Sequence, residues 1–528
     1  MNAKIIYLGQ RSITLELQND LPYYNDSLYD IYLNGELYQE KGQVNVISIY
    51  DLLPQTKYIV EIRTQEESAS VEFETKSEYV TLDVKRFGAK GDGVTDDTLF
   101  IQSCINACPK NGRVLIPSGT YSVLPLFLKS DITIELQEGA HLLGNTDRNK
   151  YPILPGMTLL TDESDDYNLG SWEGNPLDCF ASIITGVEVS NVNIIGKGII
   201  DGNAQNGDWW VDVRTKRIAW RPRGVFLVRC SNITFEGVTV TNTPSWNLHP
   251  YFSNNIRFID MKLISPKVSP NTDGCDPESC ENVDIIGVHF SVGDDCIAIK
   301  SGKIYMGRKY KKPSSNFNIR NCSMNFGHGA VVLGSEMAGG IKNINVTKCI
   351  FNETDRGLRI KTRRGRGKDA IIDGILFENI KMINVLTPLV INMFYFCDPD
   401  GKTEYVWSKE KLPVDERTPY LGEFHFKNIN CTNVNVAAGA FYGLPEMPIK
   451  KITIENVDFS YAPNPKEGVP AMMTGLEAMS NRGLIFYNVE DVVLKNVTLD
   501  NGLEKEIEAT NVSSVSYTHL TLPTNSLV

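Results

Sequence analysis

Four short motifs carry side chains that can perform acid/base chemistry. They are N-T-D-G at residues 271–274, G-D-D-C at 293–296, G-H-G at 327–329 and R-I-K at 359–361. A pair of carboxylates can supply a proton donor and an activator of water. Arg and Lys cations can hold a carboxylate of the substrate. The set as a whole predicts cleavage of an acidic sugar chain.

A repeat surrounds these motifs and predicts the fold that positions them. Each copy is a turn residue, nearly always Asn, followed by a short strand in which apolar residues alternate. The copies begin at Asn191, Asn232, Asn255, Asn282, Asn316, Asn343 and Lys451. Most recur at roughly 23 to 34 residues, which is a solenoid period. Short β-branched strands without helices between them predict an all-β chain folded as a right-handed parallel β-helix.

In such a solenoid, residues one coil apart stack on the same face. Asp273 and Asp294 are 21 residues apart, about one coil, so we expect them to be neighbours, with Asp295 beside them. Carboxylates crowded in this way cannot all remain ionised. The pKa of one of them should therefore rise, which makes that group a proton donor.

The four motifs, in this order, resemble those of the polygalacturonases, family 28 of the glycoside hydrolases. The resemblance implies that Asp294 is the general acid and that Asp273 and Asp295 hold and deprotonate the attacking water. It also implies inversion of the anomeric centre. His328, between two glycines, is expected near the acid, where it would tune the proton and contact substrate; a structural hydrogen bond is the alternative role.

Further residues are expected to bind substrate. Arg359 and Lys361 alternate about Ile360, so both should point to one side of a strand and clamp a uronate carboxylate. The remaining candidates, taken from the resemblance or from the positive patch after this strand, are Asn271, Trp246, His249, Tyr395, Arg363 and Arg364. Core packing is an equal alternative for Trp246, and another core aromatic could be confused with Tyr395.

The chain divides into three parts. Residues 1–78 read as short alternating strands, and Leu52-x-Pro54-x-Thr56-x-Tyr58 resembles the corner signature of fibronectin type III domains. Residues 79–512 are the expected β-helix, whose open end a helix over 99–107 should cover. Residues 513–528 show no coil period, and we expect no partner strand and a non-native or disordered tail there.

Composition excludes several classes of protein. The formal net charge of −12 makes nucleic acid a poor partner. The 11 cysteines lack disulfide-framework spacing, and Cys275 with Cys280 lacks the further ligands of a zinc site. We expect no metal and no cofactor.

No apolar stretch is long enough for a membrane span, and the N-terminus lacks a signal-peptide core. The chain as written is therefore expected in the cytoplasm unless a leader was removed.

The most specific expectation is exo-acting hydrolysis of α-1,4-galacturonosidic bonds. It rests on the apparent insertions after Gly302 and at 363–368, which could close one end of a cleft. An endo-polygalacturonase and a hydrolase of rhamnogalacturonan or xylogalacturonan would keep the same carboxylates. A polysaccharide lyase on the same fold and a non-catalytic carbohydrate-binding solenoid are the alternatives from other classes. The oligomeric state is open.

Overall fold

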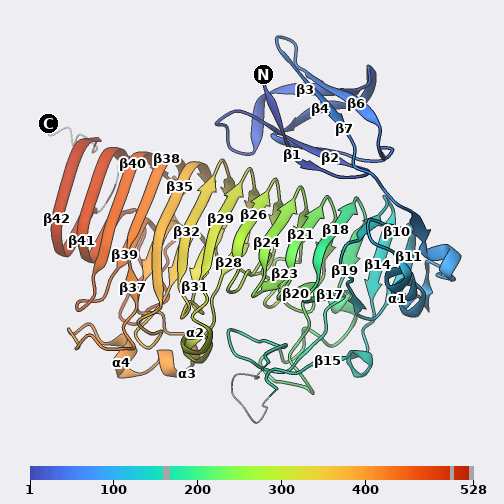
Figure 1. Ribbon diagram of the computed structural model, residues 1–528. Helices are drawn as coiled ribbons and strands as arrows, with labels where there is room; N and C mark the ends of the chain where they lie inside the picture. Colours follow the sequence, from blue (N-terminus) through green and yellow to red (C-terminus); the bar gives the residue numbers. More distant parts are fainter. Residues whose placement is uncertain (159–166, 500–502, 504, 522–528) are drawn as a thin grey trace.

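The computed structural model describes residues 1–158, 167–499, 503 and 505–521. A small sandwich at the N-terminus is followed by a long solenoid of stacked strands (Figure 1). The sandwich has a sheet of β1 (Ala3–Leu8), β2 (Ile13–Leu17) and β5 (Val46–Ile49), and a sheet of β4 (Glu36–Val44), β3 (Tyr24–Leu33), β6 (Lys57–Arg63) and β7 (Ser68–Glu74). All its pairings are antiparallel.

The corner expected from the sequence of the sandwich is present. The hydroxyl oxygen of Tyr58 accepts a hydrogen bond of 2.9 Å from the backbone N–H of Leu53. Ile31 and Val60 are among the fully buried residues between the two sheets. The N-terminal part is therefore a two-sheet sandwich with its own core, as predicted.

The solenoid has three faces, each a column of parallel strands. Face A contains β8 (Thr81–Asp83), β10 (Arg113–Ile116), β13 (Thr133–Leu136), β18 (Ser190–Gly196), β21 (Ser231–Glu236), β24 (Asn254–Ile259), β26 (Glu281–Ile286), β29 (Ser314–Arg320), β32 (Ile341–Thr347), β35 (Ile371–Ile383), β38 (Glu423–Val434), β40 (Ile449–Tyr461), β41 (Arg482–Leu499) and β42 (Lys505–Thr521). Face B contains β9 (Asp92–Asp96), β11 (Gly119–Val123), β14 (Ala140–Gly144), β19 (Ile199–Asp201), β22 (Thr239–Thr241), β25 (Lys262–Ile264), β27 (His289–Ser291), β30 (Ser323–Asn325) and β33 (Ile350–Asn352).

Face C carries the predicted site. It contains β12 (Leu126–Phe127), β17 (Ile184–Val187), β20 (Val225–Val228), β23 (Leu248–Tyr251), β28 (Ile297–Ile299), β31 (Val331–Gly334), β34 (Arg356–Lys361), β36 (Thr387–Asn392) and β39 (Ala437–Tyr442). Short pairs outside the columns involve β15 (Ile153–Leu154), β16 (Cys179–Phe180) and β37 (Tyr420–Leu421). The α-helices among the described residues are α1 (Thr98–Ala107), α2 (Ile304–Tyr310), α3 (Asp398–Gly401) and α4 (Glu404–Trp407).

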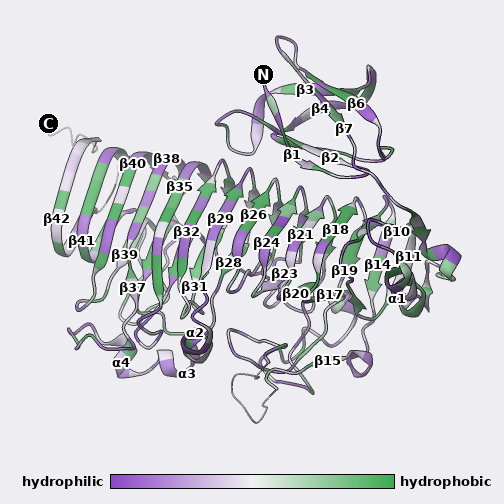
Figure 2. Ribbon diagram, in the orientation of Figure 1, coloured by the Kyte–Doolittle hydropathy of each residue, from purple (hydrophilic) through white to green (hydrophobic). Residues whose placement is uncertain are grey.

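One apolar core fills the solenoid from end to end. Apolar and polar residues alternate along the strands (Figure 2), and the inward residues from Val84 to Leu499 form a single buried cluster. The helix expected over 99–107 is α1, which lies at the N-terminal end of the stack (Figure 1). It shields the edge of the first coil from solvent, which is how natural sheets protect an open edge.

The repeated Asn residues form a ladder at the turns. Asn232, Asn255 and Asn282 all have positive φ, between 53° and 57°. Their amide groups donate to the Asn of the preceding coil over 3.0–3.1 Å. Asn tolerates the left-handed conformation better than most residues, and its amide has both a donor and an acceptor. The ladder therefore explains why the sequence repeats Asn at each coil.

The end of the chain differs from expectation. The sequence predicts no partner strand after residue 512, but β42 pairs in parallel with β41 as far as Thr521. The outer edge of a last strand offers unpaired N–H and C=O groups to any extended segment, so pairing does not require the repeat. Residues 522–528 of the expected tail lie outside the described residues. The non-native origin of the tail stays a prediction.

The sandwich is attached to the solenoid through buried carboxylates. Glu16 of β2, 3% exposed, accepts hydrogen bonds from Arg320 Nε over 2.8 Å and from Asn321 Nδ2 over 2.7 Å. Glu236 of β21 is fully buried and accepts from Ser12 and Thr14 of the sandwich. Burial raises the pKa of Glu236 to about 8. The interface thus depends on carboxylates that are almost fully buried.

We predict that Glu16→Ala destabilises this attachment. Removing one partner of a largely buried ion pair leaves Arg320 and Asn321 without their acceptor, which costs about 3 kcal/mol. The free energy of unfolding in urea should fall by this amount, and amides of β2 should exchange faster with deuterium. Glu72→Ala, at an exposed position of β7, is the matched control. Equal stability of the two variants would contradict the prediction.

Candidate functional site

Three carboxylates meet where the strands of face C begin. The one-coil partner of Asp273 is Asp295, because Cys275 pairs with Ile297 and the N–H of Gly274 donates to the Asp295 carbonyl over 2.9 Å. Asp294 lies one residue earlier. The stacking expected for Asp273 and Asp294 is therefore shifted by one residue. One carboxylate oxygen from each of the three aspartates lies within 4.8 Å of the others.

The surroundings shift the pKa values of these carboxylates in opposite directions. Burial alone would raise the pKa of Asp295, but Lys361 Nζ at 2.8 Å and an Arg359 nitrogen at 3.2 Å hold this pKa well below its usual range. Burial and the charge of Asp295 raise the pKa of Asp294. Burial raises the pKa of Asp273 well above its usual value, with Asp276 and Asp294 adding to the effect. Asp295 is thus the ionised member and Asp294 can be the proton donor.

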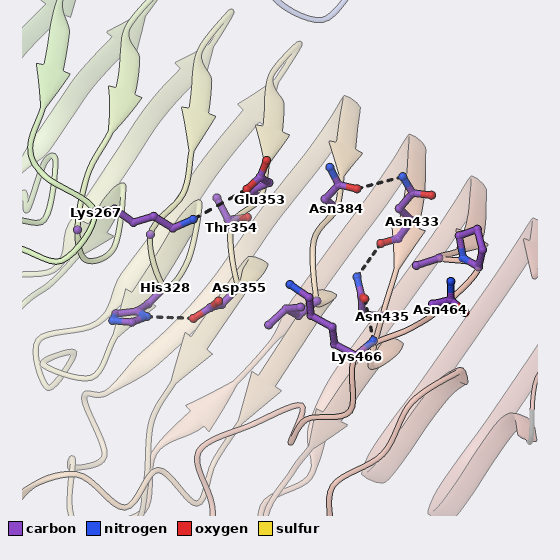
Figure 3. Close-up of a pocket in the computed structure, with 15 residues that line it drawn as sticks. Lys267, His328, Glu353, Thr354, Asp355, Asn384, Asn433, Asn435, Asn464 and Lys466 are labelled. Atoms are coloured by element: carbon purple, nitrogen blue, oxygen red, sulfur yellow. Dashed lines mark hydrogen bonds and ion pairs between the residues drawn. The ribbon is translucent and has the colours of Figure 1, made fainter.

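His328 lies directly beside Asp294. Its backbone N–H donates to the carbonyl of Asp294 over 3.3 Å, and its Nδ1 lies 3.0 Å from a carboxylate oxygen of Asp355 (Figure 3). The imidazole is about half exposed. The hydrogen bond with Asp355 raises the pKa of His328, and burial offsets part of this rise. An accessible imidazole with a raised pKa, next to Asp294, fits the predicted position.

The side chains of the R-I-K motif have the predicted orientation. They also contact a carboxylate of the protein, Asp295, which was not predicted. Arg359 and Lys361 point outward from β34 while Ile360 is fully buried in the core. Both cations contact Asp295, so they stabilise a carboxylate of the protein itself. Lys361 has three N–H donors and Arg359 has five, so each retains donors for a ligand.

Asn271 and Tyr395 lie at the border of this cluster. Asn271 has a φ of 55° and accepts a hydrogen bond of 2.6 Å from Arg221. Tyr395 is 8% exposed, and Lys361 Nζ is 5.7 Å from the centre of its ring. Contact of these two residues with substrate stays a prediction.

Trp246 and His249 are buried and do not reach the cleft, which corrects the prediction that they bind substrate. Trp246 is 2% exposed, stacks on Trp172 and is covered by Lys300 Nζ at 3.9 Å. His249 is fully buried with its Nε2 3.1 Å from Glu278. Neighbouring side chains cover both residues: Trp172 lies against Trp246, and Trp246 and Glu278 enclose His249.

Arg363 and Arg364 are also buried, which corrects their prediction as substrate-binding residues. Arg363 binds carboxylates of Asp398 and Asp400 at 3.1 and 2.9 Å. Arg364 forms a two-point ion pair with Glu446 at 2.5 and 2.8 Å and donates to backbone carbonyls of the α4 region. Each is only 1% exposed. These cations hold the segment containing α3 and α4 in place.

The sequence reasoning missed an ion cluster beside Asp273. Lys300 Nζ lies 3.1 Å from Asp276 and 3.8 Å from Glu336. Burial raises the pKa of Asp276 to about 7, although Lys300 opposes this rise. Asp276 follows Asp273 by three residues, and Lys300 ends the strand segment I-A-I-K. Strand alternation around the motifs was a signal that could have found both residues.

A second missed element is the closing loop, residues 462–481 between β40 and β41. Its Met472 sulfur lies 2.8 Å from a guanidinium nitrogen of Arg359, and the Met472 carbonyl accepts from Asn392 over 3.1 Å. The Val469 carbonyl accepts from Arg356 over 2.7 Å. This loop starts more than 100 residues after the R-I-K motif, so no local signal in the sequence indicates the contact.

Among the described residues, the three aspartates are the one group of at least three His, Cys, Asp or Glu side chains close enough to share a metal ion. Lys361 and Arg359 already compensate the charge of Asp295 there. Within the same residues, no helix has the length and apolar character needed to cross a membrane.

Comparison with known proteins identifies a family profile and several relatives. Residues 129–410 match the profile of glycosyl hydrolases family 28, and residues 81–175 match that of rhamnogalacturonase A/epimerase, pectate lyase-like. A probable polygalacturonase of Vitis vinifera is 30% identical over 406 residues, covering 75% of this chain and 77% of that protein. An exo-poly-alpha-D-galacturonosidase of Dickeya chrysanthemi is 28% identical over 66% of this chain and 62% of its own length.

A solved structure shares the whole arrangement. The family 28 exopolygalacturonase of Yersinia enterocolitica superimposes with a TM-score of 0.69 over 97% of this chain and 98% of its own, at 20% identity. At this identity the likeness establishes the fold, which is the predicted parallel β-helix with a small β domain before it.

We predict that Asp355→Asn lowers the pKa of His328. The carboxylate that favours the imidazolium would become neutral, so the proton should leave His328 at lower pH. An NMR titration of the imidazole resonances measures this directly. Glu353→Gln removes a nearby carboxylate that does not bond to His328 and serves as the control. An unchanged titration in Asp355→Asn would show that the hydrogen bond does not set the charge of His328.

Proposed function

Since the chain belongs to glycosyl hydrolases family 28, we propose that it hydrolyses α-1,4-galacturonosidic bonds of galacturonan and of oligogalacturonates derived from pectin, acting from a chain end with inversion. The glycoside hydrolase activity follows from the family. The substrate is supported by the relatives that act on polygalacturonate and by the positive charge beside the catalytic carboxylates. The observation that carries the proposal is the cluster of three aspartates within 4.8 Å in which Lys361 and Arg359 contact Asp295 alone. These contacts lower the pKa of Asp295, while the pKa of Asp294 is raised.

The acid step belongs to Asp294. Its raised pKa keeps a proton available for the glycosidic oxygen as the bond to the anomeric carbon breaks. His328, beside it, can contact the departing sugar. Activity should therefore fall as the pH rises through the pKa of Asp294, because the acid is then deprotonated.

The base step belongs mainly to Asp295. It remains ionised because Lys361 and Arg359 lie against it, so it can take a proton from water as the water attacks the anomeric carbon. Asp273, with a raised pKa, is better suited to hold this water than to deprotonate it. Two hydrogen bonds of about 2.7 Å reach about 5.4 Å, so oxygens within 4.8 Å of each other leave room for a shared water.

The cations have two roles in this proposal. Lys361 and Arg359 keep Asp295 ionised, and their remaining donors can bind the carboxylate of the sugar whose bond is cleaved. A neutral sugar would leave these buried donors without partners, which disfavours its binding. Acidic sugars should be preferred for this reason.

Action from a chain end is supported by the elements around the cleft. The closing loop contacts Arg359 and Asn392. On the opposite side of face C, α2 follows Gly302, and Arg363 and Arg364 fix the segment with α3 and α4. These elements narrow the cleft. An enzyme that cleaves in the middle of a polymer needs a cleft that is open at both ends, so a narrowed cleft favours action from a chain end.

We predict that Asp294→Asn lowers kcat on oligogalacturonates by at least ~10²–10⁴-fold, because general acid catalysis is lost. Initial rates of reducing-end release measure the effect, and circular dichroism checks the fold. Asp458→Asn, at an exposed position of β40 far from the motifs, is the matched control. Near-normal turnover by folded Asp294→Asn protein would refute the assignment of the acid.

We further predict that digestion of polygalacturonate releases mono- or digalacturonate from the start, with slow loss of viscosity. NMR of the first product should show the anomer opposite to that of the substrate bond. The three carboxylates lie closer than the ~6.5–9.5 Å usual in inverting enzymes, so retention is a meaningful contrary result. An early ladder of intermediate oligomers would show endo action, and unsaturated products that vanish with a chelator would show a lyase.

A further inference from the structure

A groove begins at His328 and continues away from the catalytic carboxylates. It has a volume of about 580 Å³ and follows the turns that precede the strands of face C (Figure 3). Its near end is formed by Gly293, Gly327 and His328, which flank Asp294. Its far end is formed by residues 462–466, the root of the closing loop. The catalytic steps derived above use only the near end.

Exposed lysines lie at both ends of this groove. Lys267 has a side chain that is 61% exposed, with its Nζ 3.9 Å from Glu353 and 4.1 Å from the centre of the Phe326 ring. Lys466 is exposed. Its backbone N–H donates to Asn435 Oδ1 over 3.0 Å, which fixes the position from which its side chain extends. In the described part of the chain no ion pair is formed by Lys466 Nζ.

Amide side chains line the groove between the lysines. Asn433 donates to Asn384 over 3.0 Å, and the Asn435 amide donates to the carbonyl of Asn433 over 2.9 Å. Each of these amides has two N–H donors and a carbonyl acceptor, so each keeps hydrogen-bonding capacity after these contacts. Figure 3 shows Asn384 and Asn433 on successive coils, with Asn435 beside Asn433 in the same coil. Fixed amides and cations of this kind suit the hydroxyl and carboxylate groups of acidic sugars.

The chemistry of the acid gives the groove a direction. The proton of Asp294 goes to the oxygen of the leaving group, so the departing part of the substrate lies on the side of the acid. His328 is on that side, because its backbone N–H bonds to Asp294 and its ring lines the groove. A chain that leaves the cleft past His328 enters this groove.

We propose that this groove binds the leaving portion of a polymeric galacturonate, with Lys267 and Lys466 pairing with carboxylates of sugars beyond the cleaved bond. The inference rests on the proposed function and deepens it by assigning a site for the part of the substrate that does not react. The closing loop would then serve both sites, since Met472 contacts Arg359 and Lys466 faces the groove.

The size of the groove fits several sugars. Lys267 Nζ reaches Glu353, in the turn between β33 and β34, and the Lys466 backbone bonds to Asn435, in the turn between β38 and β39. These two turns are two coil steps apart, which is about 10 Å. A single leaving sugar has one carboxylate and cannot pair with both lysines, whereas a longer leaving chain offers a carboxylate to each. The two lysines should therefore favour long substrates.

The test compares long and short substrates in lysine variants. We expect the ratio of kcat/KM for octagalacturonate to kcat/KM for trigalacturonate to fall about two- to five-fold in Lys466→Ala and in Lys267→Ala, as for exposed ion pairs. This ratio should fall further in the double variant than in either single variant. It should also fall further in Lys466→Glu than in Lys466→Ala. Added salt should reduce the ratio in the wild type more than in the double variant. Lys110→Ala, an exposed lysine of the first coils, is the matched control.

A binding measurement separates this inference from the proposed function. Calorimetry with the Asp294→Asn protein gives the Kd of octagalacturonate without turnover, and the Lys267 and Lys466 changes should raise this Kd two- to five-fold each. An unchanged long-to-short ratio and an unchanged Kd in the double variant would overturn the groove assignment while leaving the catalytic proposal intact. A wild type that binds octagalacturonate through these lysines and yet hydrolyses none of it would overturn the proposed function alone.

Discussion

The register of the coils is the constraint on which the rest of the structure depends. Parallel pairing of successive coils sets Asp273 opposite Asp295 and puts Arg359 and Lys361 within reach of the same carboxylate, although 66 residues separate Asp295 from Lys361. A slip of one residue would turn each of these side chains to the other face of its strand. The Asn ladder and the alternating apolar residues hold this register, because both would be disrupted by such a slip.

Electrostatics then gives chemically similar groups different roles. Burial raises the pKa of all three aspartates, but two cations beside Asp295 reverse this effect for one of them. The neighbouring Asp294 experiences the charge of Asp295 and becomes harder to ionise. A proton donor and a proton acceptor therefore arise from adjacent residues of one turn, through contacts with a strand two coils further along face C.

Elements distant in the chain complete the site. The closing loop brings Met472 to Arg359, and the buried pairs of Arg363 and Arg364 fix the segment with α3 and α4. The sandwich contributes no side chain to the carboxylate cluster, and its buried contacts through Glu16 and Glu236 are to face A and its turns. The parts that shape the cleft are thus long insertions between the strands of the stack.

The sequence by itself determined the repeat, the β-helix, the sandwich and the catalytic motifs, because these depend on local spacing and on residue type. It could not decide which polar residues reach the cleft. Trp246, His249, Arg363 and Arg364 lie in or near motifs and are nevertheless buried, because their partners Trp172, Glu278, Asp400 and Glu446 are provided by other coils and loops. The protonation states of the aspartates, the closing loop and the pairing of the last strand also depend on contacts between distant segments. Local sequence carries no record of such contacts, so only the tertiary structure decided them.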